Sequence, residues 1–229
     1  NGILGASRSL LYETTRFVDI YKIYEDIARS DRALTPEERA EMKQYQRLAD
    51  AFTPLAKGMS SEFCNQNAYD AVQVHGGSGF MKDYACERIY RDARITSIYE
   101  GTTQLQVVAA IRHVTTGTYL NQIKAYEAGE YAAELAPLKE KLMAMTALYE
   151  AAVNSVVEYK NTEYTDFHAR RLVEMAGHII MGYLLLSDAT RNDAFTKSAN
   201  VYVRYGEAEV RKLHAFVTEF RPEELNSYK

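Results

Sequence analysis

The fold is decided by residues 35–75, which read TPEERAEMKQYQRLADAFTPLAKGMSSEFCNQNAYDAVQVH. Thr35, Pro36 and Glu38 are typical of a helix start: the threonine caps free N–H groups, the proline fits the first helical position, and the glutamate closes a capping box. Large apolar residues then recur every three or four positions, as they do on one face of a helix. The stretch therefore predicts one long helix, which Pro54 either kinks or divides in two.

Helical periodicity continues on both sides of this stretch. Residues 1–29 place their apolar side chains on one face, and a shorter amphipathic helix is predicted over 85–97. Another helix is predicted to begin near Thr103 and to end at the cap signal 115–117. Between these helices, three glycines in the four positions 76–79 demand a tight, non-helical backbone.

The chain changes texture after Gly117, where three long apolar stripes follow one another at helical spacing. The stripes cover residues 135–156, 172–186 and 201–220. The polar segments 162–166 and 191–196 are interpreted as connectors between three antiparallel helices. No segment alternates apolar and polar residues as a strand would, so the sequence predicts an all-α protein with a domain boundary near Gly117.

Composition excludes several classes of protein. The 229 residues carry 27 Lys and Arg against 31 Asp and Glu, a net charge of -4 that offers no basic patch for nucleic acid. The longest apolar run, 179–186, falls well short of the ~20 residues that span a bilayer. Cys64 and Cys86 make neither a disulfide framework nor a metal-ligand spacing, and no histidine has a companion at metal spacing. We therefore expect a cytoplasmic protein with no metal site.

Two features of the central segment invite a functional interpretation. The glycine-rich run 75–80 follows a helix rather than a strand, which excludes a dinucleotide-binding fingerprint; its bare backbone fits either a ligand contact or a sharp turn between helices. Glu100 precedes Gly101 in an apolar setting at the start of a helix. A carboxylate placed there can be tuned as a general base, although a solvated carboxylate at a helix start explains it too.

Three sequence blocks in this segment resemble the C-terminal signature of the acyl-CoA dehydrogenase family. The blocks are HGGSGF at 75–80, ERIYRDARI at 87–95 and IYEGT at 98–102. They agree in order and spacing, and one departure is Ala85-Cys86, where relatives often carry a proline. Arg91, Asp92 and Arg94 of the second block are assigned to ion pairs on the helix surface.

The resemblance divides the chain into two parts. Residues 1–117 resemble the family's C-terminal four-helix bundle, and residues 118–229 resemble, more loosely, the additional C-terminal helical domain of long bacterial members. The family also has an N-terminal helical domain and a middle β-domain. Because this chain holds no β-domain and begins with Asn1 rather than methionine, it is expected to be an incomplete enzyme by itself, from a processed or longer protein.

The resemblance implies the chemistry of an FAD-dependent oxidoreductase, a flavoprotein of fatty acid β-oxidation and lipid metabolism. Glu100 matches the catalytic base, which would remove the α-proton of acyl-CoA while the β-hydride passes to flavin N5 and a trans-2-enoyl-CoA forms. The backbone N–H of Glu100 and a flavin ribityl hydroxyl would polarise the thioester carbonyl. Tyr99 and Gly101 match positions beside the substrate.

Five further positions match the family's contacts to the cofactor. Gln73, Gly76 and Gly77 match positions that touch the adenosine diphosphate moiety of FAD from a neighbouring subunit. Thr102 and Gln104 match positions that touch the FAD of their own site. A cofactor touched by two subunits implies a homodimer or homotetramer.

The resemblance also implies electron-transfer flavoprotein as the electron acceptor. Two alternatives remain open from the sequence. The chain could be a non-catalytic helical interaction domain of the same fold, or it could belong to an acyl-CoA oxidase, which shares the base and differs in its use of oxygen. The length of the acyl chain and the number of subunits are not determined by these residues.

Overall fold

The structure is a computed structural model that describes residues 2–228, and within that range the chain forms helices and no strand. The N-terminal helices are α1 (Gly2–Arg29), α2 (Pro36–His75), α3 (Gly77–Phe80), α4 (Ala85–Ile95) and α5 (Thr103–Thr115). The C-terminal elements are α6 (Thr118–Glu127), η1 (Ala133–Leu135), α7 (Ala136–Val157), α8 (Thr162–Arg191), η2 (Asp193–Phe195), α9 (Thr196–Glu219) and η3 (Pro222–Tyr228). The predicted all-α fold is confirmed.

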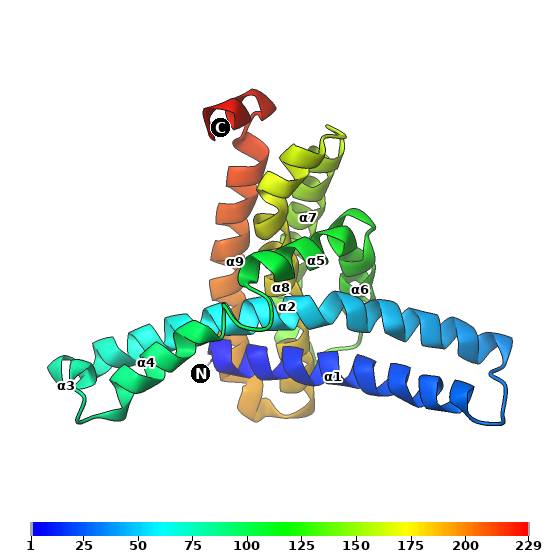
Figure 1. The fold of residues 1–229 in the computed structure, drawn as a ribbon, viewed down its shortest axis with the longest axis horizontal. Coiled ribbons are helices and arrows are strands. Elements are labelled where there is room, and N and C mark those ends of the chain that lie inside the picture. Colours follow the sequence, from blue (N-terminus) through cyan, green and yellow to red (C-terminus); the bar gives the residue numbers. More distant parts are fainter. Residues whose placement is uncertain (1, 229) are drawn as a thin grey trace.

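Two groups of helices cross one another. Figure 1 shows α1 and α2 as a long antiparallel hairpin, with α4 running back along the C-terminal end of α2 and α5 crossing toward α6. Helices α7, α8 and α9 stand across this hairpin as a second antiparallel bundle. Helix α8 contacts α1 and α5 as well as its bundle neighbours, so one apolar core extends from Leu10 in α1 to Val217 in α9.

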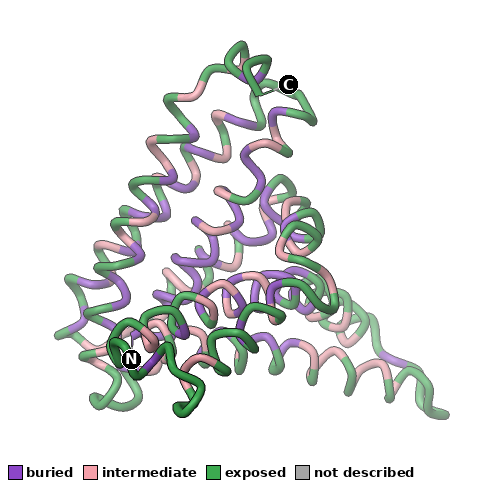
Figure 2. Tube along the Cα trace, turned by 60° about the vertical axis from the view of Figure 1, so that its left-hand side comes forward, coloured by how far each residue is buried: buried purple, intermediate pink, exposed green. Residues whose placement is uncertain are grey.

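Helix α8 forms the centre of this core. By length and composition alone it could cross a membrane, yet 78% of its most apolar window is buried inside the protein. Figure 2 shows the buried residues gathered on the inner faces of the helices, where the helices meet, with the helix ends mostly exposed. Apolar residues all round a helix are what a fully enclosed core helix requires.

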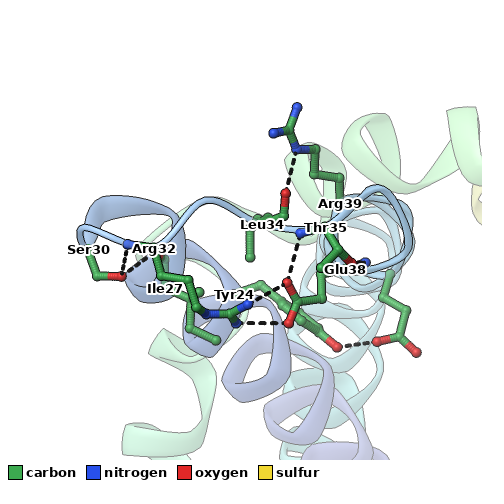
Figure 3. A network of polar contacts seen from close by, with 9 residues as sticks. Tyr24, Ile27, Ser30, Arg32, Leu34, Thr35, Glu38 and Arg39 are labelled. Carbon is green, nitrogen blue, oxygen red and sulfur yellow. Dashed lines mark hydrogen bonds and ion pairs between the residues drawn. The ribbon is translucent and has the colours of Figure 1, made fainter.

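The start of α2 has the capping box that the sequence predicts. The Thr35 hydroxyl accepts a hydrogen bond from the Glu38 N–H at 3.2 Å, and the Glu38 carboxylate accepts one from the Thr35 N–H at 2.9 Å. Arg32 donates to both oxygens of the same carboxylate at 2.8 and 3.0 Å (Figure 3). These contacts, with Arg32 first, hold the pKa of Glu38 below its usual value. The turn between α1 and α2 is therefore fixed by one carboxylate.

Replacing Thr35 with alanine is expected to lower the free energy of unfolding by about 1 kcal/mol, because the Glu38 N–H loses its acceptor. Urea denaturation measures the change. Thr218→Ala, at an exposed threonine near the end of α9, is the control and should have almost no effect. Equal losses in the two variants would show that the box does not stabilise the helix start.

The structure corrects two sequence predictions and settles a third. The segment 162–166 is no connector: it forms the first turns of α8, because the Asn161 side chain caps the helix by accepting from the Tyr164 N–H at 3.1 Å. The glycine run is not wholly non-helical, since only Gly76 has a positive φ, 58°, and α3 follows at once. Pro54 does not divide α2, because the helix continues past the proline as far as His75.

Candidate functional site

The segment between α4 and α5 carries the candidate base in an unusual backbone conformation. Glu100 has φ 51° and Gly101 has φ 94°, so two successive residues lie at positive φ. A non-glycine residue held there costs about 1–3 kcal/mol and persists only where its surroundings fix it. We call residues 96–102 the base loop.

Hydrogen bonds from α5 fix the C-terminal end of the base loop. The Thr102 hydroxyl accepts from the Leu105 N–H at 3.3 Å and so caps α5. The Gln106 amide nitrogen donates back to the carbonyls of Glu100 and Gly101, at 3.4 and 3.2 Å. The loop and the first turn of α5 therefore form one hydrogen-bonded unit.

Helices α2 and α4 hold the other parts of the base loop. The Lys57 ammonium, from the middle of α2, donates to the carbonyl of Thr96 at 2.7 Å and to that of Gly101 at 2.8 Å. Arg94 donates to the Ser97 hydroxyl. The predicted ion pairs of the second sequence block are wrong: across residues 2–228, Arg91, Asp92 and Arg94 form none.

Gly101 is favoured by its φ of 94°, which residues with a side chain rarely adopt, and a side chain there would push the flexible Gln106 amide away from the loop. A Cβ at this position would lie 2.7 Å from the Gln106 amide nitrogen. Gly101→Ala is therefore expected to lower the free energy of unfolding by about 1–2 kcal/mol. Gly58→Ala is the matched control: Gly58 lies inside α2, its Cβ would meet only the Gln106 Cβ of α5 at an ordinary distance of 3.7 Å, and alanine should stabilise the helix. Chemical denaturation of both variants measures the difference, and an unchanged stability of Gly101→Ala would contradict the role given to the loop.

The Glu100 side chain lies on the surface, and the expected apolar setting is wrong for the residues described. Glu100 is exposed, as are Tyr99 at 50% and Ile98 at 44%. The apolar neighbours in sequence point outward rather than around the carboxylate. Within residues 2–228 the carboxylate of Glu100 makes no hydrogen bond or ion pair, and its backbone N–H has no acceptor. Both groups are free to meet a ligand.

Exposed apolar side chains are frequent from the C-terminal part of α2 to α5, at both ends of α4. They are Tyr69, Val74, Phe80, Met81, Tyr84, Ile89, Tyr90, Ile95, Ile98, Tyr99, Leu105 and Val108. An open groove of about 500 Å³ also runs beside the loop, between α1 and α2, and is lined by Leu11, Ala56, Cys64 and Tyr99 among others. Exposed apolar surface of this kind marks a contact with a ligand or with protein.

The residues expected to hold a cofactor form two separate groups. Gln73, Gly76 and Gly77 are exposed where α2 ends, and a Cβ at either glycine would meet nothing within 4 Å. Thr102 and Gln104 are exposed at the start of α5. Figure 1 places the two groups at opposite ends of α4. The part of the chain that the structure describes contains no cluster of three or more side chains suited to a metal ion.

Lys57 and Gln106 were not among the predicted site residues, although one signal in the sequence pointed to the lysine. Lys57 is the only charged residue between Asp50 and Glu62, in the otherwise uncharged run AFTPLAKGMSS. A single cation in such a run needs a partner, and the base loop supplies it. Gln106 carries no signal, since an amide on an amphipathic helix is ordinary.

Two family models match consecutive parts of the chain. The model described as "Acyl-CoA dehydrogenase, C-terminal domain" matches residues 30–115, and the one described as "Acyl-CoA dehydrogenase C terminal" matches residues 115–225. The chain belongs to the acyl-CoA dehydrogenase family. All three signature blocks and the base loop lie within the first of these matches.

Two named relatives match the chain over different lengths. The caffeyl-CoA reductase-Etf complex subunit CarC of Acetobacterium woodii is 54% identical over 52 residues, 23% of this chain and 14% of the relative. Butyryl-CoA dehydrogenase of Syntrophomonas wolfei is 27% identical over 195 residues, 80% of this chain and 30% of the relative. The chain therefore spans less than a third of the length of these two relatives.

A solved structure supports the fold of almost the whole chain. The crystal structure of an acyl-CoA dehydrogenase complexed with FAD from Bacillus anthracis aligns with a TM-score of 0.68, over 94% of this chain and 40% of the solved chain. Its sequence identity is 18%, so the likeness concerns the helical fold alone. Both crossed groups of helices thus belong to an arrangement that this family uses.

Proposed function

We propose that the chain is the C-terminal part of an FAD-dependent acyl-CoA dehydrogenase in which Glu100 is the catalytic base. The observation that carries this proposal is the geometry of one residue. Glu100 is fixed at positive φ, while its carboxylate and its N–H have no partner across residues 2–228. A backbone strained to expose two unpaired polar groups is typical of a catalytic position.

The two free groups of Glu100 fit the two demands of the reaction. The carboxylate accepts the α-proton of the acyl-CoA, and the backbone N–H donates to the thioester carbonyl, where negative charge develops. Bound FAD supplies the acceptor at N5 for the β-hydride, and the product is a trans-2-enoyl-CoA. Tyr99 and Gly101 flank the base and would lie against the substrate, with the groove between α1 and α2 beside them.

The exposed positions at both ends of α4 fit a shared cofactor. Gly76 and Gly77 offer bare backbone on which the diphosphate of FAD could lie, and Gln73 stands one turn away on α2. Thr102 and Gln104 would touch a second FAD beside the base loop. The resemblance assigns the two groups to two cofactor copies, and hence the protein to a homodimer or homotetramer.

The electron acceptor and the setting follow from the same proposal. A relative named as a subunit of a reductase–Etf complex supports electron-transfer flavoprotein as the partner. We place the enzyme in fatty acid β-oxidation, in the cytoplasm.

Anaerobic titration of the full-length protein with saturated acyl-CoAs of graded chain length tests the function. The protein should be yellow, and its flavin band should bleach with acyl-CoAs of a limited range of lengths and recover with electron-transfer flavoprotein. Recovery with oxygen and release of hydrogen peroxide would instead identify an acyl-CoA oxidase. A colourless protein, or one that no acyl-CoA bleaches, would identify a non-catalytic helical domain.

A further inference from the structure

Lys57 lies on α2, 39 residues before Thr96 in the sequence, yet its ammonium contacts both ends of the part of the base loop that carries Glu100. We propose that Lys57 is a positioning residue for the base: it holds Glu100 in its reactive conformation by binding the two carbonyls that bracket it. This inference rests on the proposed function, since it assigns Lys57 a part in the reaction of Glu100.

The geometry of the contact is that of a clamp. Lys57 Nζ lies 2.7 Å from the Thr96 oxygen and 2.8 Å from the Gly101 oxygen, and between these two residues lie only residues 97–100. One ammonium thus ties the end of α4 to the turn before α5. Because Lys57 stands near the middle of the 40-residue helix α2, whose backbone is continuous, the clamp is anchored on the most extended element of the fold.

Each of the two carbonyls lies where a hydrogen bond from a cation is stabilising. Thr96 lies at the C-terminal end of α4, where carbonyls lack helical partners and the helix dipole favours positive charge. Gly101 follows directly on the strained φ of Glu100, so its carbonyl direction depends on that strain being held. A charged donor makes a stronger hydrogen bond than a neutral one.

Besides the two loop carbonyls, no group of opposite charge in the described part of the chain accounts for the position of the Lys57 ammonium. Within residues 2–228 it forms no ion pair with a carboxylate. Its ammonium lies 5.7 Å from the centre of the Tyr99 ring, inside the same loop, and the residue is half-buried. Gln106 shares the Gly101 carbonyl, but through a longer contact of 3.2 Å from a neutral amide. Lys57 is therefore the main restraint that α2 applies to the base.

A positioning role predicts a specific kinetic pattern for Lys57→Met in the full-length protein. Methionine keeps an unbranched apolar stem, one atom shorter than lysine, and removes all three donors. A displacement of about 1 Å can cost about 100-fold in rate, so we expect flavin reduction by acyl-CoA to slow by about 10- to 100-fold. Lys57 also lines the groove between α1 and α2, but its ammonium is bound to the two loop carbonyls and methionine keeps the apolar stem in the groove, so the KM for acyl-CoA should change little.

Three comparisons separate positioning from general support of the fold. Lys57→Arg keeps a charged donor that reaches two carbonyls and should restore most of the rate. Lys43→Met makes the same substitution at an exposed lysine of the same helix and should leave the rate unchanged. Amide hydrogen exchange of residues 97–103 should quicken in Lys57→Met while the flavin content stays that of the wild type.

The outcomes distinguish this inference from the proposed function. A wild-type protein that acyl-CoA does not bleach would refute the proposed function and the positioning role with it. If acyl-CoA reduces the flavin of the wild type and of Lys57→Met at the same rate, only the positioning role is refuted. The positioning role is also overturned if Lys57→Met loses its flavin, or if Lys57→Met and Lys57→Arg reduce flavin equally slowly. In either case Lys57 would support the fold rather than the base.

Discussion

Replacing Glu100 with glutamine is expected to stop acyl-CoA from reducing the flavin of the full-length protein while the flavin stays bound. An amide has nearly the same size as the carboxylate but cannot accept the α-proton. Removal of a general base costs about 10²- to 10⁴-fold in rate, and we expect at least that loss here. Anaerobic stopped-flow absorbance at the flavin band measures the rate directly.

The structure indicates that this loss will be chemical rather than structural. The Glu100 carboxylate makes no contact within residues 2–228 that glutamine would break, so flavin content and the thermal midpoint should be unchanged. Glu158→Gln, at an exposed position at the end of α7, is the control and should reduce flavin at the wild-type rate. A Glu100→Gln variant as fast as this control would show that another group removes the proton.

The second large effect expected is a loss of stability in mild acid, caused by two buried histidines of the C-terminal bundle. Both ring nitrogens of His168 lack hydrogen-bond partners, and the ring of Tyr164 lies 4.6 Å away. Burial, helped by Arg171, lowers the pKa of His168 to about 4. Burial also lowers the pKa of His178 to about 4, against a partial opposing effect of Glu209.

The sign of the effect follows from where the protons bind. A histidine of the unfolded chain has a pKa near 6.5. Between pH 6.5 and 4 the unfolded state therefore binds protons at these two histidines, whereas the folded state does not. The stabilising contribution is therefore complete above pH 6.5 and is lost as the pH falls toward 4. Each histidine should cost about 2 kcal/mol of unfolding free energy between pH 7 and pH 5.

Urea denaturation at pH 7 and pH 5 measures this loss. His168→Phe should remove the part of the acid-induced loss that is due to His168. It should also stabilise the protein at pH 7, since an unpaired buried polar group disappears. His75→Gln, at an exposed histidine, is the control and should leave the pH dependence as it is. If His168→Phe and wild type lose the same stability on acidification, His168 is not the source of the acid sensitivity.

The local structure of this chain follows closely from its sequence because it depends on short-range hydrogen bonds. The start of α2 was predictable because Thr35 and Glu38 satisfy each other three residues apart. The base loop was recognisable from the run of residues 98–102. Pro54 was ambiguous because the effect of a proline depends on packing, and here the residue is buried within a continuous helix.

What could not be predicted depends on contacts between segments distant in sequence. The clamp of Lys57 on Gly101 joins residues 44 positions apart, and no spacing rule foresees it. The exposure of Glu100 also depends on which side of α4 and α5 faces the core. The apolar residues Ile98 and Tyr99 predicted buried surroundings for Glu100, but both side chains are exposed. The crossing of α8 against α1 and α5 likewise comes from packing rather than from any local signal.

Abstraction of the α-proton, the step that we propose for Glu100, is tested most directly by anaerobic flavin reduction with acyl-CoA that carries deuterium at the α-carbon. We expect the full-length wild-type protein to reduce its flavin several-fold more slowly with the deuterated substrate than with the ordinary one. Cleavage of that bond would then limit the step in which Glu100 acts. Equal rates with the two substrates, in single turnovers limited by chemistry, would contradict the assignment of proton abstraction to this site.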